Sequence, residues 1–278
     1  MASNKIKQNL AQKMSEIMPI NEALSEIDFI IKEHLNINKI DLILKPNILN
    51  EHVQLIEKII DERLSTRKPL QYILNKAVFD GDIYYVDENT LIPRPETEIL
   101  VCECVKYLNS KSKILEIGTG SGCISISLAK RLQNDFITSC DISNKAIQVA
   151  KKNAKSICPQ RRINFVESDL YSNINNKFDA IISNPPYIDF ELKKDMQREV
   201  LDYEPHSALF AENNGMYFYE KIIKSAKNYL NKGGLIAFEA GVNQGKKIKK
   251  ILENEGVSKV ITIIDLSSID RVVLGWYN

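Results

Sequence analysis

The stretch that decides the fold is KILEIGTGSG, residues 113–122. A short apolar run opens it, and three glycines at alternating positions come directly after that run. Glycine lets the backbone turn tightly and approach a ligand closely. A strand that leads through a glycine turn into a helix is typical of open α/β sheets, which bind ligands beyond the carboxyl ends of their strands.

The spacing of the glycines separates two classes of cofactor. A dinucleotide-binding fingerprint requires GxGxxG, but its third glycine would fall at position 123, which is Cys123. The pattern here is GxGxG, which argues against a nicotinamide-dependent dehydrogenase. Since a glycine turn alone can serve structure only, the case for a ligand depends on the residues at the ends of the later strands.

From residue 113 onward, predicted strands and helices alternate. The expected strands are 113–117, 136–140, 163–166, 178–183, 235–239, 260–265 and 272–277. Such alternation predicts an α/β fold with a mainly parallel, seven-stranded sheet covered by helices on both faces. Because no helix separates the last two strands, one of them is expected to run antiparallel to its neighbour.

Acidic residues stand after successive strands of this sheet. Asp141 ends the second strand, about 20 residues beyond the glycines, where an acid can bind both hydroxyls of a ribose. Asp169 and Leu170 come after the third strand, where a side chain can contact adenine. An aspartate alone at such a position is more often a helix cap or turn residue, but together these residues predict an adenosine-containing ligand. Glu116 is placed to offset the cationic methionine end of S-adenosylmethionine.

The fourth strand leads into Asn184-Pro185-Pro186-Tyr187. In isolation this run can be a rigid turn, but its acceptors also suit a planar NH₂ group, whose delocalised lone pair makes it a poor nucleophile. The side-chain carbonyl of Asn184 and the backbone carbonyl of Pro185 can each accept one of its hydrogens, and proline adds no competing N–H. Tyr187 can stack on the flat group. The motif predicts methyl transfer to a planar nitrogen, with no metal and no covalent intermediate.

The first part of the chain predicts a helical bundle. Apolar residues recur at helical spacing over residues 21–35 and again over 51–64, and a further helix is expected before Pro19. No residue there suggests catalysis. We therefore assign residues 1–75 to an N-terminal helical domain.

A linker is expected between the helical part and the α/β part. Residues 76–92 predict a β-hairpin, because two short runs of apolar, aromatic and β-branched residues flank Asp80-Gly81. The segment Leu91–Glu98 carries two prolines and is expected to enter a helix only near Glu96. Residues 93–278 then form the α/β domain.

Composition narrows the class of partner. The 37 Lys and Arg nearly balance the 36 Asp and Glu, whereas proteins that grip a phosphate backbone usually carry a clear positive bias. This balance argues against a nucleic-acid substrate. The 5 cysteines form no CxxC pair, so neither a disulfide framework nor a zinc site is predicted. With no signal peptide or membrane span expected, we place the protein in the cytoplasm.

Several segments together resemble one family, over nearly the whole chain. They are Lys68–Ile73, Phe79–Gly81, Leu91–Glu98, Asn184–Tyr187, Glu204–Leu209, and Glu239 with Gln244-Gly245. The sequence resembles the bacterial release-factor glutamine methyltransferases, the PrmC/HemK family. That resemblance implies a Rossmann-like class I methyltransferase domain with a small N-terminal helical bundle, which docks the substrate, and a β-hairpin linker.

The resemblance also implies roles for individual residues. S-adenosylmethionine, which leaves as S-adenosylhomocysteine, would contact Gly118, Thr119, Gly120, Ser121, Gly122, Asp141, Leu170 and Asn184, beside the acids Glu116 and Asp169. Asn184, Pro185 and Tyr187 would be catalytic and, with Pro186, would hold the glutamine of the Gly-Gly-Gln loop of class 1 peptide-chain release factors. Arg94 and Glu98 would brace the site or shape the substrate channel.

Other functions use the same motif. A methyltransferase that acts on adenine N6 or guanine N2 in nucleic acid must also activate a planar NH₂ group, and its target base is flipped into the pocket. An enzyme acting on a ribosomal-protein glutamine is a second alternative, and a non-enzymatic protein that binds S-adenosylmethionine is a third. We expect a monomer that acts on a release factor, not on a membrane or a nucleic acid.

Overall fold

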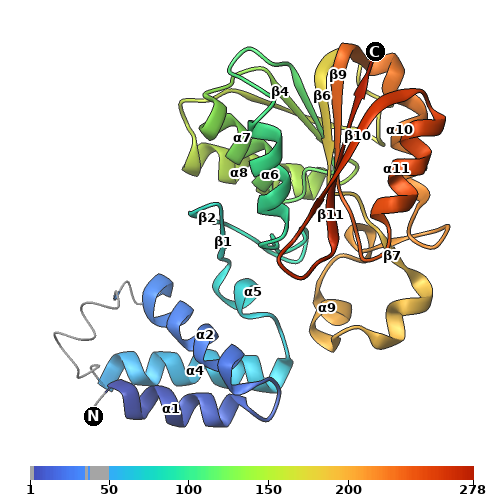
Figure 1. Ribbon diagram of the computed structural model, residues 1–278. Coiled ribbons are helices and arrows are strands. Elements are labelled where there is room, and N and C mark those ends of the chain that lie inside the picture. Colours follow the sequence, from blue (N-terminus) through green and yellow to red (C-terminus); the bar gives the residue numbers. More distant parts are fainter. Residues whose placement is uncertain (1–2, 35–36, 38–49) are drawn as a thin grey trace. The chain divides into compact units, whose positions relative to one another are not determined.

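The computed structural model describes residues 3–34, 37 and 50–278, which fall into two compact units. The first unit consists of Met1–Asn75 and Arg198–Tyr203, and the second of Lys76–Gln197 and Glu204–Asn278. Figure 1 traces the chain through its helices and strands. In the described part of the chain, every helix is too short or too polar to cross a lipid bilayer.

The first unit is a small helical bundle, as predicted. Its elements are α1 (Ser3–Met14), α2 (Ile20–Phe29), the short π-helix η1 (Ile30–His34), α4 (Asn50–Thr66) and α5 (Leu70–Leu74). The apolar stripes of α2 and α4 form its core, where Ile27, Ile56 and Ile60 are fully buried. The end of the predicted first stripe, Leu35, lies outside the described residues.

A short helix from far along the chain completes this unit. The helix α9 (Arg198–Tyr203) groups with residues 1–75 rather than with the α/β domain to which the sequence assigned it. The Glu199 carboxylate lies 3.5 Å from Arg63 and 3.4 Å from Arg67. The Tyr203 hydroxyl donates to the Thr66 carbonyl at 2.6 Å. These polar contacts link segments more than 130 residues apart, so no local pattern could reveal them.

The second unit is built on a seven-stranded sheet of order β10-β11-β9-β6-β3-β4-β5. The strands are β3 (Ile114–Ile117), β4 (Ile137–Asp141), β5 (Ile163–Glu167), β6 (Phe178–Ser183), β9 (Leu230–Glu239), β10 (Val257–Ile264) and β11 (Asp270–Tyr277). Neighbouring strands are parallel except that β11 runs antiparallel to both β9 and β10. The predicted strand count, the parallel sheet and its antiparallel exception are confirmed.

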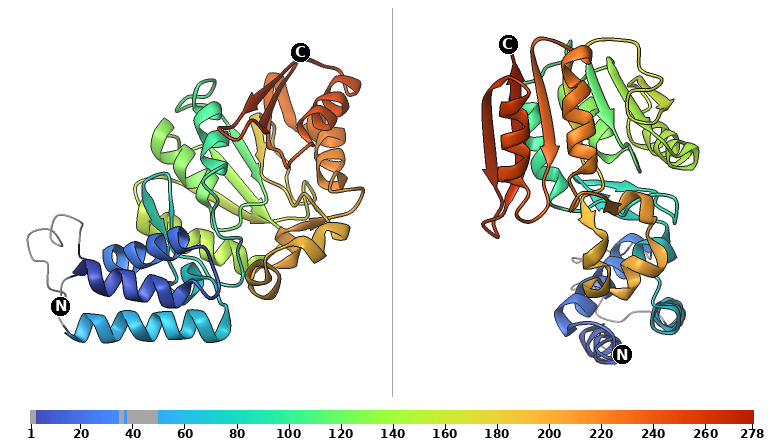
Figure 2. Two further views of the ribbon diagram at one scale, coloured as in Figure 1. Left: turned by 60° about the horizontal axis from the view of Figure 1, so that its bottom comes forward. Right: turned by 90° about the vertical axis from the view of Figure 1, so that its right-hand side faces the viewer.

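Helices cover both faces of the sheet, as Figure 2 shows. The helices α6 (Thr97–Val105), α7 (Cys123–Leu132) and α8 (Asn144–Ile157) pack on one face, and α10 (Tyr217–Tyr229) and α11 (Gly245–Asn254) on the other. Each face has its own apolar core, with Leu100 and Ile126 buried in one and Tyr219 and Ile248 in the other.

The order of the strands determines where a ligand can bind. From β3 the chain proceeds outward to β4 and β5, then returns to the other side of β3 as β6. Ligands bind at such a reversal, beyond the carboxyl ends of the strands. Gly118 comes directly after β3 and Asn184 directly after β6, so the topology brings the two motifs together. A Cβ atom built on Gly118 would lie 3.9 Å from the Asn184 carbonyl oxygen.

Two further features lie outside the seven-stranded sheet. The predicted hairpin is present as β1 (Ala77–Phe79) and β2 (Asp82–Tyr84). The segment after Tyr187 contains β7 (Ile188–Asp189), η2 (Phe190–Asp195), η3 (His206–Ala208) and β8 (Phe210–Ala211), besides α9. Because β7 pairs with β8, the two ends of this excursion are held side by side. The short elements after Tyr187 have too few residues to produce a sequence periodicity, and none of them was predicted.

Candidate active site

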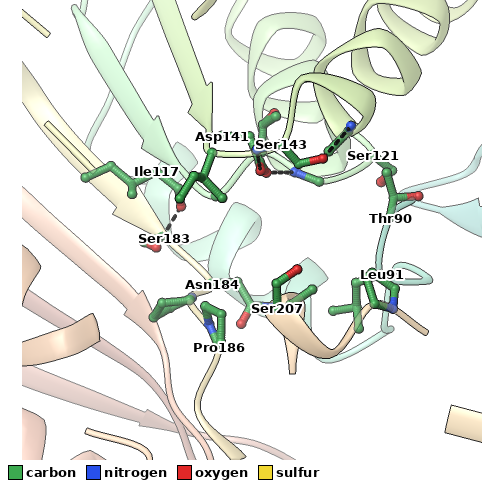
Figure 3. A pocket seen from close by; sticks show the side chains of 18 of the residues that line it. Thr90, Leu91, Ile117, Ser121, Asp141, Ser143, Ser183, Asn184, Pro186 and Ser207 are labelled. Carbon is green, nitrogen blue, oxygen red and sulfur yellow. Dashed lines mark hydrogen bonds between the residues drawn. The ribbon is translucent and has the colours of Figure 1, made fainter. Parts of the chain in front are cut away.

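A cavity of about 290 Å³ lies at the carboxyl edge of the sheet. Its lining combines the glycine turn, the ends of β4 and β6, and the segments around residues 89–97 and 205–210. In Figure 3, Asp141 and Ser143 lie on one side of the cavity, and Asn184, Pro186 and Ser207 on the other. Motifs that are far apart in the sequence therefore face the same space.

Most of the predicted site residues line this cavity. They are Arg94, Gly118, Thr119, Gly120, Ser121, Asp141, Asp169, Leu170, Asn184, Pro185 and Pro186. Four predicted residues lie outside the lining: Glu98, Glu116, Gly122 and Tyr187. Each of these four residues is instead held by contacts with other parts of the second unit.

The glycine turn is held in the left-handed backbone region, since Gly118, Gly120 and Gly122 all have positive φ. The backbone N–H groups of Gly118 and Thr119 donate to the Cys140 carbonyl, which fixes the turn to β4. A Cβ atom on Gly122 would lie 3.1 Å from the Ala150 Cβ of α8. Gly122 thus allows α7 and α8 to pack closely.

Asp141 projects into the cavity from the end of β4. One carboxylate oxygen accepts the Gly120 N–H and the other accepts the Ser143 N–H, both at 2.9 Å. Burial raises the pKa of this carboxyl. Each oxygen keeps a lone pair beyond its backbone contact, so the side chain is a fixed double acceptor that suits a vicinal diol.

Glu116 is fully buried behind Thr119, which lines the cavity. The hydroxyls of Thr119 and Ser139 both donate to its Oε2 atom. Within the described residues, Oε1 has no hydrogen-bond partner. Burial raises the pKa of Glu116 to about 7. An unpaired carboxylate oxygen in this position suits a cationic group, which would restore the ionised form.

Asn184 is held by a side chain from α6. Its Nδ2 atom donates to the Thr97 hydroxyl at 3.2 Å. Just before the motif, the Ser183 hydroxyl donates to the Ile117 carbonyl at 2.7 Å, which anchors the turn to β3. The amide group is therefore fixed on one side, while its other side remains for the cavity.

Tyr187 has a different place from the one predicted. Its hydroxyl donates to Glu239 at 3.3 Å, and burial raises its pKa. Its carbonyl accepts from Gln244 at 2.9 Å. A Cβ atom on Gly215 would lie only 2.0 Å from that same carbonyl oxygen. The ring is thus packed beneath the motif, supporting the turn, rather than lining the cavity where it could stack on a substrate.

Arg94 and Glu98 have separate contacts. Arg94 lines the cavity and pairs with the buried Glu204 at 2.5 Å, while the Ile92 N–H donates to the other Glu204 oxygen. Glu98 instead accepts the Asp80 N–H of the hairpin at 2.8 Å. Glu204 was not among the predicted site residues, although its segment contributed to the family resemblance.

Comparison with known proteins gives the class of the second unit. Residues 95–202 match the family model described as the methyltransferase small domain. A methyltransferase from Pyrococcus furiosus shares the fold, with a TM-score of 0.54 and 17% identity over 80% of this chain and 98% of that one. The chain is a methyltransferase.

The first unit and the full-length relatives specify the family. Residues 4–74 match the PrmC N-terminal domain. A release factor glutamine methyltransferase of Flavobacterium psychrophilum is 39% identical over 271 residues, covering 94% of both chains. One of Streptococcus pneumoniae is 35% identical over 97% of this chain and 98% of that protein. The chain belongs to the family of release factor glutamine methyltransferases.

Proposed function

We propose that this protein transfers a methyl group from S-adenosylmethionine to the side-chain amide nitrogen, N5, of the glutamine in the Gly-Gly-Gln motif of class 1 release factors. One observation carries the proposal: Asn184 and Pro185, the two residues with the proposed acceptors, line the same cavity as Asp141 and the glycine turn. Family membership selects a glutamine over a nucleic-acid base. The test is methyl transfer to purified release factor, compared with a variant that lacks the glutamine.

The residues that would hold S-adenosylmethionine form the β4 side of the cavity. Asp141 is the acceptor for the ribose hydroxyls, Leu170 lies after β5 on the side expected for adenine, and Glu116 offsets the cationic amino-acid end. The cofactor supplies an electrophilic methyl group on its sulfonium. Glu116 fits this ligand because its buried, unpaired oxygen lacks a positive partner in the described residues.

The Asn184 side of the cavity would hold the glutamine amide. Two carbonyl oxygens, from the Asn184 side chain and the Pro185 backbone, each accept one amide hydrogen. This orients the nitrogen and favours the positive charge that develops on it. Arg94, fixed by Glu204 at the cavity wall, shapes the entrance.

Cofactor binding is expected to depend on the ionisation of Glu116. Its pKa is raised to about 7, and a cationic ligand prefers the carboxylate. Affinity is therefore full above pH 7 and is lost as the pH falls through that value. S-adenosylhomocysteine should bind about tenfold more weakly at pH 6 than at pH 8, since affinity falls tenfold per pH unit below the pKa. Calorimetric titration measures this, and the Glu116→Gln variant should be weak at both pH values. If the affinity of the wild-type protein for S-adenosylhomocysteine did not change with pH, this role of Glu116 would be contradicted.

We assign substrate docking to the N-terminal helical domain. No described residue of this part lines the cavity, so a shortened chain without residues 1–75 should still bind cofactor and methylate a short Gly-Gly-Gln peptide. It is expected to lose methylation of the intact release factor, because the docking domain is removed. A full-length Glu199→Gln variant controls for the ion pairs with Arg63 and Arg67 that the deletion removes. Unchanged methylation of the intact factor would refute docking.

The setting of the reaction can be inferred from the substrate. A substrate that belongs to the translation machinery places the enzyme in the cytoplasm, and all five cysteines are free thiols, in keeping with a reducing compartment. We propose that the enzyme acts as a monomer, because a single chain supplies both the residues proposed to bind the cofactor and those proposed to bind the glutamine amide.

A further inference from the structure

We propose that Glu239, acting through Thr97, sets the hydrogen-bond polarity of the substrate site by holding Asn184 with its carbonyl oxygen toward the cavity. Glu239 and Thr97 are positioning residues: they act through Asn184. The inference rests on the proposed function in one respect only, that the group to be bound is an NH₂.

The three side chains come from three separate elements. Thr97 is the first residue of α6, Glu239 is the last residue of β9, and Asn184 comes directly after β6. The Thr97 hydroxyl donates to Glu239 Oε2 at 2.5 Å, and Asn184 Nδ2 donates to Thr97 Oγ1 at 3.2 Å. Thr97 and Glu239 are 2% and 1% exposed. Water therefore cannot easily replace the buried Thr97–Glu239 contact, whereas the Asn184–Thr97 contact is half-buried at the cavity wall.

The chemistry of the groups fixes the direction of both hydrogen bonds. An ionised carboxylate only accepts, so the single hydroxyl proton of Thr97 is used by Glu239. The Thr97 oxygen is then left as an acceptor, and only the NH₂ end of Asn184 can satisfy it. The two ends of an amide are similar in size, and their hydrogen-bond partners decide its orientation. A reversed Asn184 would place two acceptors against each other.

The hydrogen-bonded chain Glu239–Thr97–Asn184, here called the relay, requires Glu239 in its ionised form. Burial raises the pKa of this carboxyl, and three neighbours act against that rise: Thr97 and Tyr187 donate to it, and Arg271 brings a positive charge. Arg271 is itself anchored by Asp265 at 3.0 Å. Tyr187 thus has a function in this network that differs from stacking: it occupies the second oxygen of Glu239, leaving Oε2 for Thr97.

The polarity of Asn184 matters because the substrate group is a double donor. A carbonyl oxygen toward the cavity accepts one N–H of the glutamine amide. A reversed Asn184 would present its own N–H groups to those of the substrate, and in a buried site this repulsion is weakly screened. The relay therefore selects a substrate group that donates hydrogen bonds over a carbonyl or carboxylate oxygen, which can only accept them.

Two nearly isosteric substitutions test the relay. Glu239→Gln introduces an amide that can donate to Thr97 and so reverse the chain of donors. Thr97→Val removes the hydroxyl and keeps the shape. Each is expected to lower kcat by about 10- to 100-fold, somewhat less than the loss of a direct preorganised contact, while cofactor affinity changes by less than about tenfold. Thr97→Ser should restore activity to within about threefold of wild type.

The double variant gives a stricter test. If Glu239 acts only through Thr97, Glu239→Gln combined with Thr97→Val should be no slower than the slower single variant, since residues in one network are not additive. Thr262→Val on the edge strand β10, outside the cavity lining, is the matched control. Additive losses, or a Thr97→Ser variant as slow as Thr97→Val, would overturn the proposal.

A measurement that needs no catalysis can distinguish failure of this inference from failure of the proposed function. In protein labelled with ¹⁵N-asparagine, the side-chain amide protons of Asn184 should exchange slowly with water in wild type and in Thr97→Ser. They should exchange faster in Glu239→Gln and Thr97→Val. If the wild-type enzyme transferred no methyl group to release factor, the proposed substrate would be rejected. Equal exchange rates of the Asn184 amide protons in all four proteins would instead reject the relay.

Discussion

Replacing Asn184 by alanine should lower kcat for glutamine methylation by about 100- to 1,000-fold, the range found when one preorganised hydrogen-bonding group is removed from an active site. The alanine cannot accept the amide hydrogen, so the nitrogen is neither oriented nor stabilised as it gains positive charge. Initial rates with saturating labelled S-adenosylmethionine and release factor measure the effect. Cofactor affinity should change by less than tenfold.

Two comparisons make the Asn184 result specific. Asn164→Ala, at an exposed position of β5 outside the cavity lining, should keep wild-type rates and unfold at the same temperature. Full activity of Asn184→Ala would contradict the mechanism. A matching loss in Asn164→Ala would show that the assay reports general damage to the fold.

Asp141→Ala should raise the dissociation constant of the cofactor by about 100-fold or more. Two ribose hydroxyls would lose a charged acceptor, and each such hydrogen bond contributes roughly 1.5–3 kcal/mol. The backbone N–H groups of Gly120 and Ser143 lose their partner too. Titration with S-adenosylhomocysteine measures the change, beside wild type.

Asp169→Ala is the informative comparison for Asp141. Asp169 also lines the cavity, but its side chain is exposed, whereas the carboxylate that holds the glycine turn is that of Asp141. Replacement of Asp169 should weaken binding by less than tenfold. If the two variants bind equally well, Asp141 is not the main ribose acceptor.

The fold could be predicted from sequence because its signals are local. Each strand of the α/β unit contains a short apolar run, and helices separate most of these strands, so their order along the chain predicts a mainly parallel sheet. That one of the last two strands runs antiparallel to its neighbour could be inferred because no helix separates them; the structure shows that β11 is antiparallel to both β9 and β10. The glycine turn and Asn184 could be brought together in advance because parallel strands present their carboxyl ends at one edge.

The remaining features depend on contacts between distant polar residues. Thr97 and Glu239 are 142 residues apart, and Arg94 and Glu204 are 110 apart. Their segments contributed to the resemblance, but no pattern indicated that they would pair. Tyr187 shows the same limit: an aromatic residue after two prolines suggests stacking, and only the positions of Glu239 and Gln244 reveal that it is packed beneath the motif.

The most direct measurement is methyl transfer from labelled S-adenosylmethionine to a purified class 1 release factor, beside the same factor with the glutamine of its Gly-Gly-Gln motif replaced by alanine. Label on the wild-type factor alone, recovered as N5-methylglutamine, is the predicted result. Equal label on both factors, or label on neither while ribosomal protein or nucleic acid is methylated, would contradict glutamine methylation of release factors.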